Sequence, residues 1–216
     1  MKTLRVFLLL AICSTAVSAQ DVSARLAGRV PPEIAALVHQ LATSAAARGL
    51  PVDPLIQKAI EGSAKRVPAD RVATALRALV GQLDVAAVAL QRAGPALTDT
   101  DAIAAGAFAL NAGLSDRQVT ALARASRPPY SVAATLRVTS TLAAMGVPAA
   151  DAVDLVTQVI ASGGATTEVL GLPAQVMSGV SHGQGVTPAQ AAAGLARAAA
   201  ARANAPGQNR SHPGKP

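Results

Sequence analysis

Residues 50–79 read LPVDPLIQKAIEGSAKRVPADRVATALRAL and carry the pattern that the rest of the chain repeats. In the second half of this stretch, apolar side chains return at three- and four-residue steps, at Val72, Leu76 and Leu79. This spacing matches the 3.6-residue period of an amphipathic helix, and no segment shows the sustained alternation of a half-buried strand. The sequence therefore predicts an all-α protein.

Helix ends are marked by local chemistry along the whole chain. Gly49, Gly113 and Gly146 stand where a helix C-cap would be followed directly by the next helix. Residues 115–118 and 187–190 fit the capping box, in which a hydroxyl and an amide each satisfy a backbone donor. These signals predict helices near residues 32–48, 54–65, 68–92, 99–112, 115–126, 131–145, 148–162, 166–182 and 187–203.

Further glycines and prolines predict kinks or breaks within this series, because glycine is flexible and proline lacks a backbone donor. No helix is predicted between residue 20 and residue 31. The predicted kinks and breaks are Gly81, Gly94-Pro95, Pro128-Pro129 and residues 171–173.

The chain also resembles itself. Residues 50–79 align without gaps on residues 97–126, and residues 147–172 align on residues 97–122. We therefore expect about three divergent copies of a two-to-three-helix unit of 47–50 residues, the range of helical repeats that stack on their neighbours. Similarity from alanine-rich composition alone is the other explanation of the alignment, and a compact helical bundle is the alternative architecture.

The N-terminal residues 1–19, MKTLRVFLLLAICSTAVSA, have the three-part layout of an export signal. Basic residues precede a short apolar run, and small residues follow it, which predicts a signal peptide cleaved after Ala19. The apolar run is shorter than the roughly 20 residues of a transmembrane anchor, and lipidation of Cys13 is a second alternative. We expect a periplasmic or secreted product, with an α-helical domain at 20–203, a disordered basic tail at 204–216 and no transmembrane segment after cleavage.

Charge and composition argue against several classes of partner. The chain has 19 basic and 12 acidic residues, but two basic residues lie in the leader and four follow Glu168, so the segment between is nearly neutral. After the leader the aromatic residues are Phe108 and Tyr130, and there is no cysteine. Nucleic-acid binding is not expected, since single strands are gripped by aromatic stacking between basic residues. Without disulfides, the fold must depend on its packed core.

Catalytic and metal-binding patterns are weak. Residues 179–183, GVSHG, satisfy G-x-S-x-G, but no strand precedes Ser181 and no acidic residue follows it, so we expect a turn between helices. His39, His182 and His212 are far apart in sequence, whereas zinc sites need clustered ligands. No catalytic, cofactor or metal site is predicted, and the protein is not expected to be an enzyme.

Residues 53–72, DPLIQKAIEGSAKRVPADRV, resemble a PLxxKAxEGxAKxVPxxR-type pattern of uncharacterised exported bacterial helical proteins, which have no known activity. The resemblance covers these twenty residues and implies a possible partner surface formed by Lys58, Glu61, Lys65 and Arg71. The first three also lie at three- and four-residue steps, which predicts local ion pairs.

We therefore expect an exported, non-enzymatic α-helical protein that acts as a structural or protein-interaction module. Its partner would be an unknown protein or a component of the cell envelope. The alternatives are an envelope-binding protein tethered through its basic tail, since cations attract anionic surfaces, and an enzyme with an unrecognised site.

Overall fold

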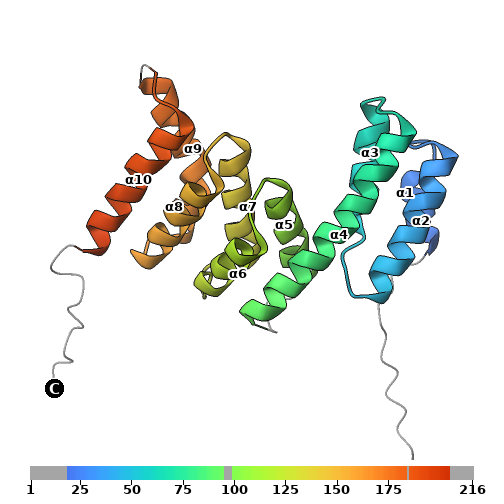
Figure 1. Ribbon diagram of the computed structural model, residues 1–216, viewed down its shortest axis with the longest axis horizontal. Coiled ribbons are helices and arrows are strands. Elements are labelled where there is room, and N and C mark those ends of the chain that lie inside the picture. Colours follow the sequence, from blue (N-terminus) through green and yellow to red (C-terminus); the bar gives the residue numbers. More distant parts are fainter. Residues whose placement is uncertain (1–18, 95–98, 184, 205–216) are drawn as a thin grey trace, which may run out of the picture.

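The computed structural model describes residues 19–94, 99–183 and 185–204, which form ten α-helices and, in these ranges, no strand (Figure 1). The prediction of an all-α fold is confirmed. The predicted leader, up to residue 18, the predicted tail from residue 205, and Pro95 lie outside the described residues. The helices are α1 (Ala19–Leu26), α2 (Pro32–Ala47), α3 (Asp53–Ala64), α4 (Ala69–Ala93), α5 (Thr100–Asn111), α6 (Asp116–Ala125), α7 (Val132–Ala144), α8 (Ala149–Ala161), α9 (Thr166–His182) and α10 (Pro188–Ala203).

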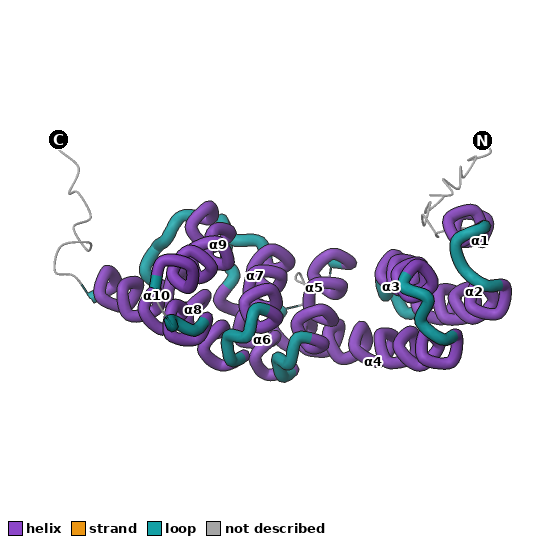
Figure 2. The backbone as a smooth tube through the Cα atoms, turned by 90° about the horizontal axis from the view of Figure 1, so that it is seen from above, coloured by secondary structure: helices purple, strands orange, loops and turns teal. Residues whose placement is uncertain are grey.

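The helices form two layers that follow the chain from one end of the molecule to the other. Odd-numbered helices lie in one layer and even-numbered helices in the other (Figure 2). Substantial packing joins each helix to helices one or two places away in the sequence, and to none further away in the described part. Packing restricted to near neighbours is the property of a helical-repeat array. The fold is therefore an open array and not a closed bundle.

The structural unit is a pair of antiparallel helices, one from each layer. Pairs α3–α4 and α5–α6 correspond to the first two copies expected from the sequence, residues 50–79 and 97–126. The third expected copy, residues 147–172, covers α8 and the start of α9, so it begins in the opposite layer (Figure 2). Its alignment is displaced by one helix, because the turns that end α5 and α8 have the same form and dominate the match.

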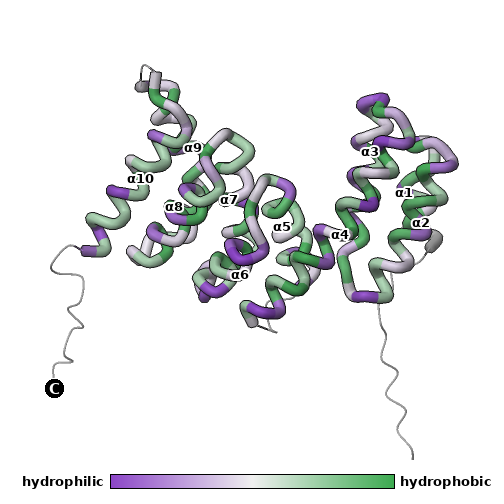
Figure 3. The backbone as a smooth tube through the Cα atoms, viewed as in Figure 1, coloured by the Kyte–Doolittle hydropathy of each residue, from purple (hydrophilic) through white to green (hydrophobic). Residues whose placement is uncertain are grey.

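Leucine, valine and alanine side chains form one continuous core between the layers. Leu76, Leu83 and Leu90 of α4 are completely buried and lie along most of that helix. Figure 3 shows hydrophobic residues along every helix, with hydrophilic ones frequent at helix ends. By length and composition alone α4 could cross a membrane. In this fold its leucines are covered by neighbouring helices instead.

The turns between helices repeat one hydrogen-bonding pattern. At the end of α5, the Leu114 amide donates to the Ala109 carbonyl at 3.0 Å and the Gly113 amide to Leu110 at 3.1 Å, which is a Schellman motif. Gly113 has φ +98°, and Gly49 and Gly146 also have positive φ. The three predicted C-caps are confirmed. At the end of α3 the same position is occupied by Arg66, with φ +55°.

Both predicted capping boxes are also present. Ser115 accepts from the Gln118 amide and Thr187 from the Gln190 amide, and each glutamine side chain accepts from the amide of its capping residue. These contacts satisfy donors that the first turn of a helix leaves free. The starts of α6 and α10 are therefore specified by four adjacent residues each.

One described helix was not predicted. Helix α1 has eight residues with only one buried step, from Val22 to Leu26, which is too short for a period to be detected. Of the positions predicted as kinks or breaks, Gly81 and Pro173 are not breaks, since α4 and α9 continue through them as the predicted ranges 68–92 and 166–182 do. An internal proline costs about 3 kcal/mol and a glycine about 1 kcal/mol. Burial on both sides, such as that of Leu172 next to Pro173, offsets these costs.

Candidate functional site

The four charged residues expected to form a surface lie together at one end of the α3–α4 pair. Lys58, Glu61 and Lys65 follow one face of α3, while Arg71 lies in the first turn of α4. Glu61 pairs with Lys58 at 3.5 Å and with Lys65 at 2.5 Å, so the predicted ion pairs are confirmed. All four line a shallow cavity of about 290 Å³ whose apolar wall includes Val72. We call them the basic cluster.

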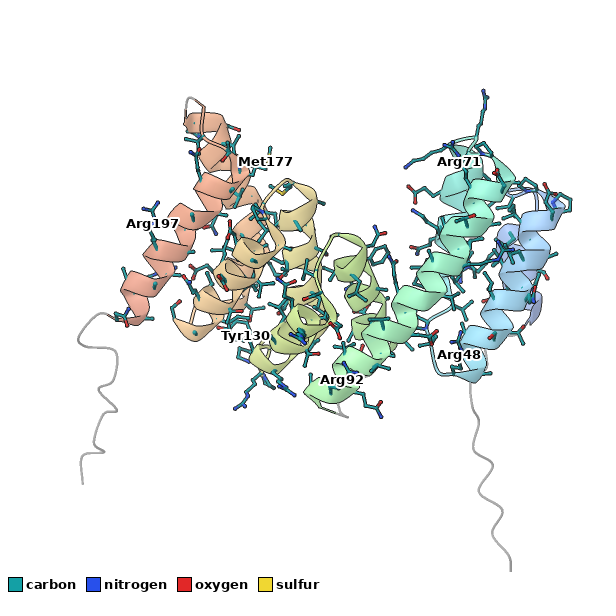
Figure 4. All side chains as sticks on the ribbon, viewed as in Figure 1. Arg48, Arg71, Arg92, Tyr130, Met177 and Arg197 are labelled. Carbon is teal, nitrogen blue, oxygen red and sulfur yellow. The ribbon has the colours of Figure 1, made fainter. Side chains whose placement is uncertain are left out.

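The basic cluster carries three positive charges and one negative charge. The hydrogen bond from Lys65, and then the nearby Lys58 charge, lower the pKa of Glu61, so its carboxylate stays ionised at neutral pH. Arg71 is exposed and pairs with no carboxylate in the described ranges. Figure 4 labels Arg71 at the same end of the pair as the turn that follows α3. The cluster therefore has an excess positive charge of two, available to a negatively charged group.

A gap in the odd layer lies next to this cluster. Helix α1 packs on α3, α5 on α7, and α7 on α9, but α3 and α5 contact each other at most marginally. Both pack on α4 through a glycine: Gly62 lies against Val72, and Gly106 against Ala86. Val72 and Ala86 are separated by about 21 Å along the axis of α4, at 1.5 Å per residue, so α3 and α5 make these contacts at different parts of that helix.

A groove occupies this gap, with α4 as its floor and α3 and α5 as its walls. Its central cavity measures about 270 Å³, and it shares Lys58 and Glu61 with the basic cluster. The most prominent side chain is Phe108 of α5, which is 48% exposed. We call this the α3–α5 groove. Its lining is Pro54, Gln57, Lys58, Glu61, Ala75, Ala78, Leu79, Gln82, Ala107, Phe108 and Asn111.

Ion pairs join several neighbouring helices of each layer. Arg25 of α1 pairs with Asp53 of α3, and Arg137 of α7 pairs with Asp101 of α5. In the even layer, pairs join α2 to α4 and α4 to α6. Among the described residues no ion pair joins α3 to α5, and the charges of α3 that face the groove pair within their own helix. The α3–α5 step therefore has neither substantial packing nor an ion pair, whereas the α7–α9 step packs without a described ion pair.

The two ends of the groove differ in charge. At the end away from the basic cluster, a further cavity of about 240 Å³ is lined by Asp53, Asp101 and Arg137, together with Phe108. Both carboxylates there are already paired with arginines. The groove is thus positive at one end, apolar in the middle and close to neutral at the other end.

The groove and the basic cluster combine apolar and charged groups. The ionisable side chains are lysines, an arginine and the ionised Glu61. An apolar centre beside uncompensated cations can hold an amphipathic, negatively charged ligand.

The other sequence patterns do not assemble into a site. Ser181 lies in the last turn of α9, where its hydroxyl donates to the Met177 carbonyl at 2.9 Å, so the expected turn begins only after His182. His39 contacts the Ser23 hydroxyl at 2.8 Å and joins α2 to α1. Across the described residues, no three potential metal-ligating side chains lie together.

The four basic residues that follow Glu168 do not form one group. Arg197 and Arg202 lie on α10, and Arg202 pairs with Glu168 at 2.6 Å. This pairing raises the pKa of Arg202. Arg210 and Lys215 lie outside the described residues. Two of the four basic residues that follow Glu168 therefore belong to the helical array, and one of these two is paired with a carboxylate.

Sequence reasoning located the basic cluster but missed Phe108 and the groove. The sequence signal for Phe108 was its rarity, as the single phenylalanine after the leader. Its exposure could not be read from the periodicity, because its neighbours Ala107 and Ala109 are both buried.

No protein-family model, curated protein or solved structure matches the chain. The fold and the groove define its class directly: an all-α, two-layer helical-repeat array with one interrupted step. Function has to be inferred from that interruption.

Proposed function

We propose that the protein is an exported, non-enzymatic helical-repeat protein that acts as a protein-interaction module through the α3–α5 groove. The observation that carries this proposal is the juxtaposition of the exposed Phe108 with the basic cluster, at the one step where adjacent odd helices fail to pack. Repeat arrays present extended surfaces of this kind to their partners. The leader pattern supports action in the periplasm or outside the cell.

An aromatic side chain exposed in a partly apolar hollow is a typical anchor of protein interfaces, where aromatic and arginine residues contribute most binding energy. The groove supplies the aromatic residue, Phe108, and the adjoining basic cluster supplies the arginine, Arg71. The groove also contains two amides, Gln82 on its α4 floor and Asn111 on its α5 wall, that can donate and accept hydrogen bonds.

The experiment is affinity capture from a periplasmic extract of the source bacterium. The wild-type protein is compared with a variant carrying alanine at the basic cluster, Lys58, Glu61, Lys65 and Arg71. We expect a protein recovered by the wild type to fall at least tenfold with this variant. A control variant replaces three exposed cations and one exposed anion away from the groove by alanine; these are Arg117, Arg127, Asp154 and Arg197.

Equal recovery by all three proteins would contradict the proposal. A loss with the control variant as large as that with the groove variant would contradict it too, since the effect would then follow net charge and not position. Circular dichroism at 222 nm shows whether each variant keeps its helix content.

A further inference from the structure

Resting on the proposed function, we infer that the partner enters the α3–α5 groove as a single amphipathic α-helix whose acidic residues lie over the basic cluster. The geometry points to a helix because every other step of the odd layer packs helix on helix, whereas α3 and α5 do not pack on each other. At this step the facing sides of α3 and α5 and the α4 floor between them line a groove. A helix laid there would have helices on both sides, as the other members of the layer do.

The floor of the groove is suited to such a helix. Ala75, Ala78, Leu79 and Gln82 occupy positions i, i+3, i+4 and i+7 of α4 and therefore lie on one face of that helix. The two alanines allow close approach, and Phe108 stands at the side where a leucine or methionine of the incoming helix can contact its ring. Apolar residues at i, i+3, i+4 and i+7 are the recognised pattern of a helix bound in a groove.

Charge decides the polarity of the occupant. The basic cluster has two uncompensated positive charges, whereas the carboxylates at the other end of the groove are paired with arginines. Carboxylates near one end of the incoming helix would complement the cluster, and a basic helix would be repelled. Complementary charge of this kind contributes mainly to specificity and to the rate of association.

The same reasoning disfavours segments of this chain that lie outside the described residues. Residues 1–18 carry Lys2 and Arg5 without an acidic residue, and residues 205–216 carry Arg210 and Lys215 without an acidic residue. Both would place further positive charge next to the basic cluster. We therefore assign the groove to a helix of another protein.

The test is a selection from a displayed library of 16-residue peptides against the full processed protein. Every peptide has leucine at positions 3, 6, 7, 10 and 14, and a random choice of glutamate, lysine, glutamine or serine elsewhere. We expect the enriched peptides to cluster glutamates near one end and to bind as helices. Fluorescence anisotropy then gives the Kd of each enriched peptide for the wild type and for groove variants.

Two groove variants and two matched controls separate position from composition. Phe108→Ala and the double variant Lys65→Glu, Arg71→Glu should each raise the Kd at least tenfold. If Phe108→Ala loses helix content, Phe108→Gln serves as a second variant that removes the ring. Leu170→Ala removes an equally exposed apolar side chain from α9. Arg117→Glu with Arg127→Glu makes the same charge change away from the groove. Neither control should raise the Kd more than twofold.

Three outcomes would overturn the inference. Enriched peptides that need Phe108 but are neutral or basic would refute the acidic helix and leave the groove as a binding surface. Enriched peptides that bind every variant equally, or a library that yields no binder, would count against the groove itself. A Phe108-dependent dimer in sedimentation equilibrium would show that a second copy of the chain occupies the groove.

Discussion

Arg66 is the one described residue other than glycine with a positive φ, and replacing it by glycine should stabilise the protein. Its φ of +55° places it in the left-handed region, at the position that glycine occupies at the ends of α2, α5, α7 and α8. For a residue with a Cβ this conformation costs about 1–2 kcal/mol. Glycine loses about 0.5–1 kcal/mol more backbone entropy on folding. Arg66→Gly should therefore gain about 0.5–1 kcal/mol.

Urea unfolding followed by circular dichroism at 222 nm measures this gain. With a denaturant dependence of about 2 kcal/mol per molar urea, the midpoint should rise by about 0.25–0.5 M. Arg66→Ala removes the guanidinium but keeps the left-handed residue, so its midpoint should stay below that of Arg66→Gly. The guanidinium has no hydrogen bond or ion pair with another described residue, so deleting it should cost little.

The repeat supplies the reciprocal change. Gly113 is the counterpart of Arg66 in the next copy, with φ +98° and open space where a Cβ would be placed. Gly113→Ala therefore introduces backbone strain without a clash and should lose about 1 kcal/mol or more. The reasoning is refuted if Arg66→Gly and Arg66→Ala unfold at the same urea concentration, or if Gly113→Ala unfolds with the wild type.

Three further predictions concern packing, capping and ionisation. Gly62→Ala would place a Cβ 2.7 Å from Val72 Cγ2 and should cost about 1–3 kcal/mol by overpacking. When Val72→Ala is added, urea unfolding should show a loss of stability smaller than the sum of the two single losses. Strict additivity of the two losses would contradict the close contact. Thr187→Ala removes a capping contact worth about 1 kcal/mol. Hydrogen exchange followed by mass spectrometry should then show faster exchange concentrated in α10. Equal acceleration of exchange along the whole array would argue against a local effect. Lys65 and Lys58 lower the pKa of Glu61 from 4.5, so the ion pairs stabilise the fold above that pH, and their contribution of a few tenths of a kcal/mol is lost on acidification. NMR should show the Glu61 carboxyl titrating below 4.5 in the wild type and at a higher pH in Lys65→Met. An unchanged titration in Lys65→Met would refute the assigned cause.

Helix positions could be predicted from the sequence because the chain marks most helix ends with local chemistry. The capping box that begins at Ser115 and the glycine at 113 act within a few residues, so neither depends on the rest of the fold. Between the marked ends, the period of leucine and valine indicates which face is buried. These signals were enough for nine of the ten described helices.

Features that depend on distant packing were not predictable in this way. Helix α1 has only Val22 and Leu26 to bury, and it is helical because α2 and α3 cover that pair. The local cost of Gly81 or Pro173 in a helix was correctly recognised, but the compensation comes from the flanking core residues. Local propensity is a weak prior wherever tertiary contacts decide the outcome.

The candidate site shows the same division. The charges of the basic cluster are close together in sequence, so their grouping around the turn at Arg66 could be anticipated. Phe108 is 37 positions beyond Arg71, and whether it faces solvent or a neighbouring helix depends on where α5 crosses α4. That crossing is set by Gly106 against Ala86, a contact between two small residues that leaves no mark in the hydrophobic period.

The length of α4 explains why the groove exists. In the alignment of the first two copies, Leu79 corresponds to Ser126, where α6 has already ended, yet α4 continues to Ala93. This extension adds about four helical turns, and α5 packs on the extension, at Ala86, while α3 packs near the start of α4, at Val72. A copy without the extension would bring α5 directly against α3 and close the layer. The irregular step in the repeat is therefore what separates the two helices, leaves Phe108 without a neighbour on one side, and opens the surface beside the basic cluster to a partner.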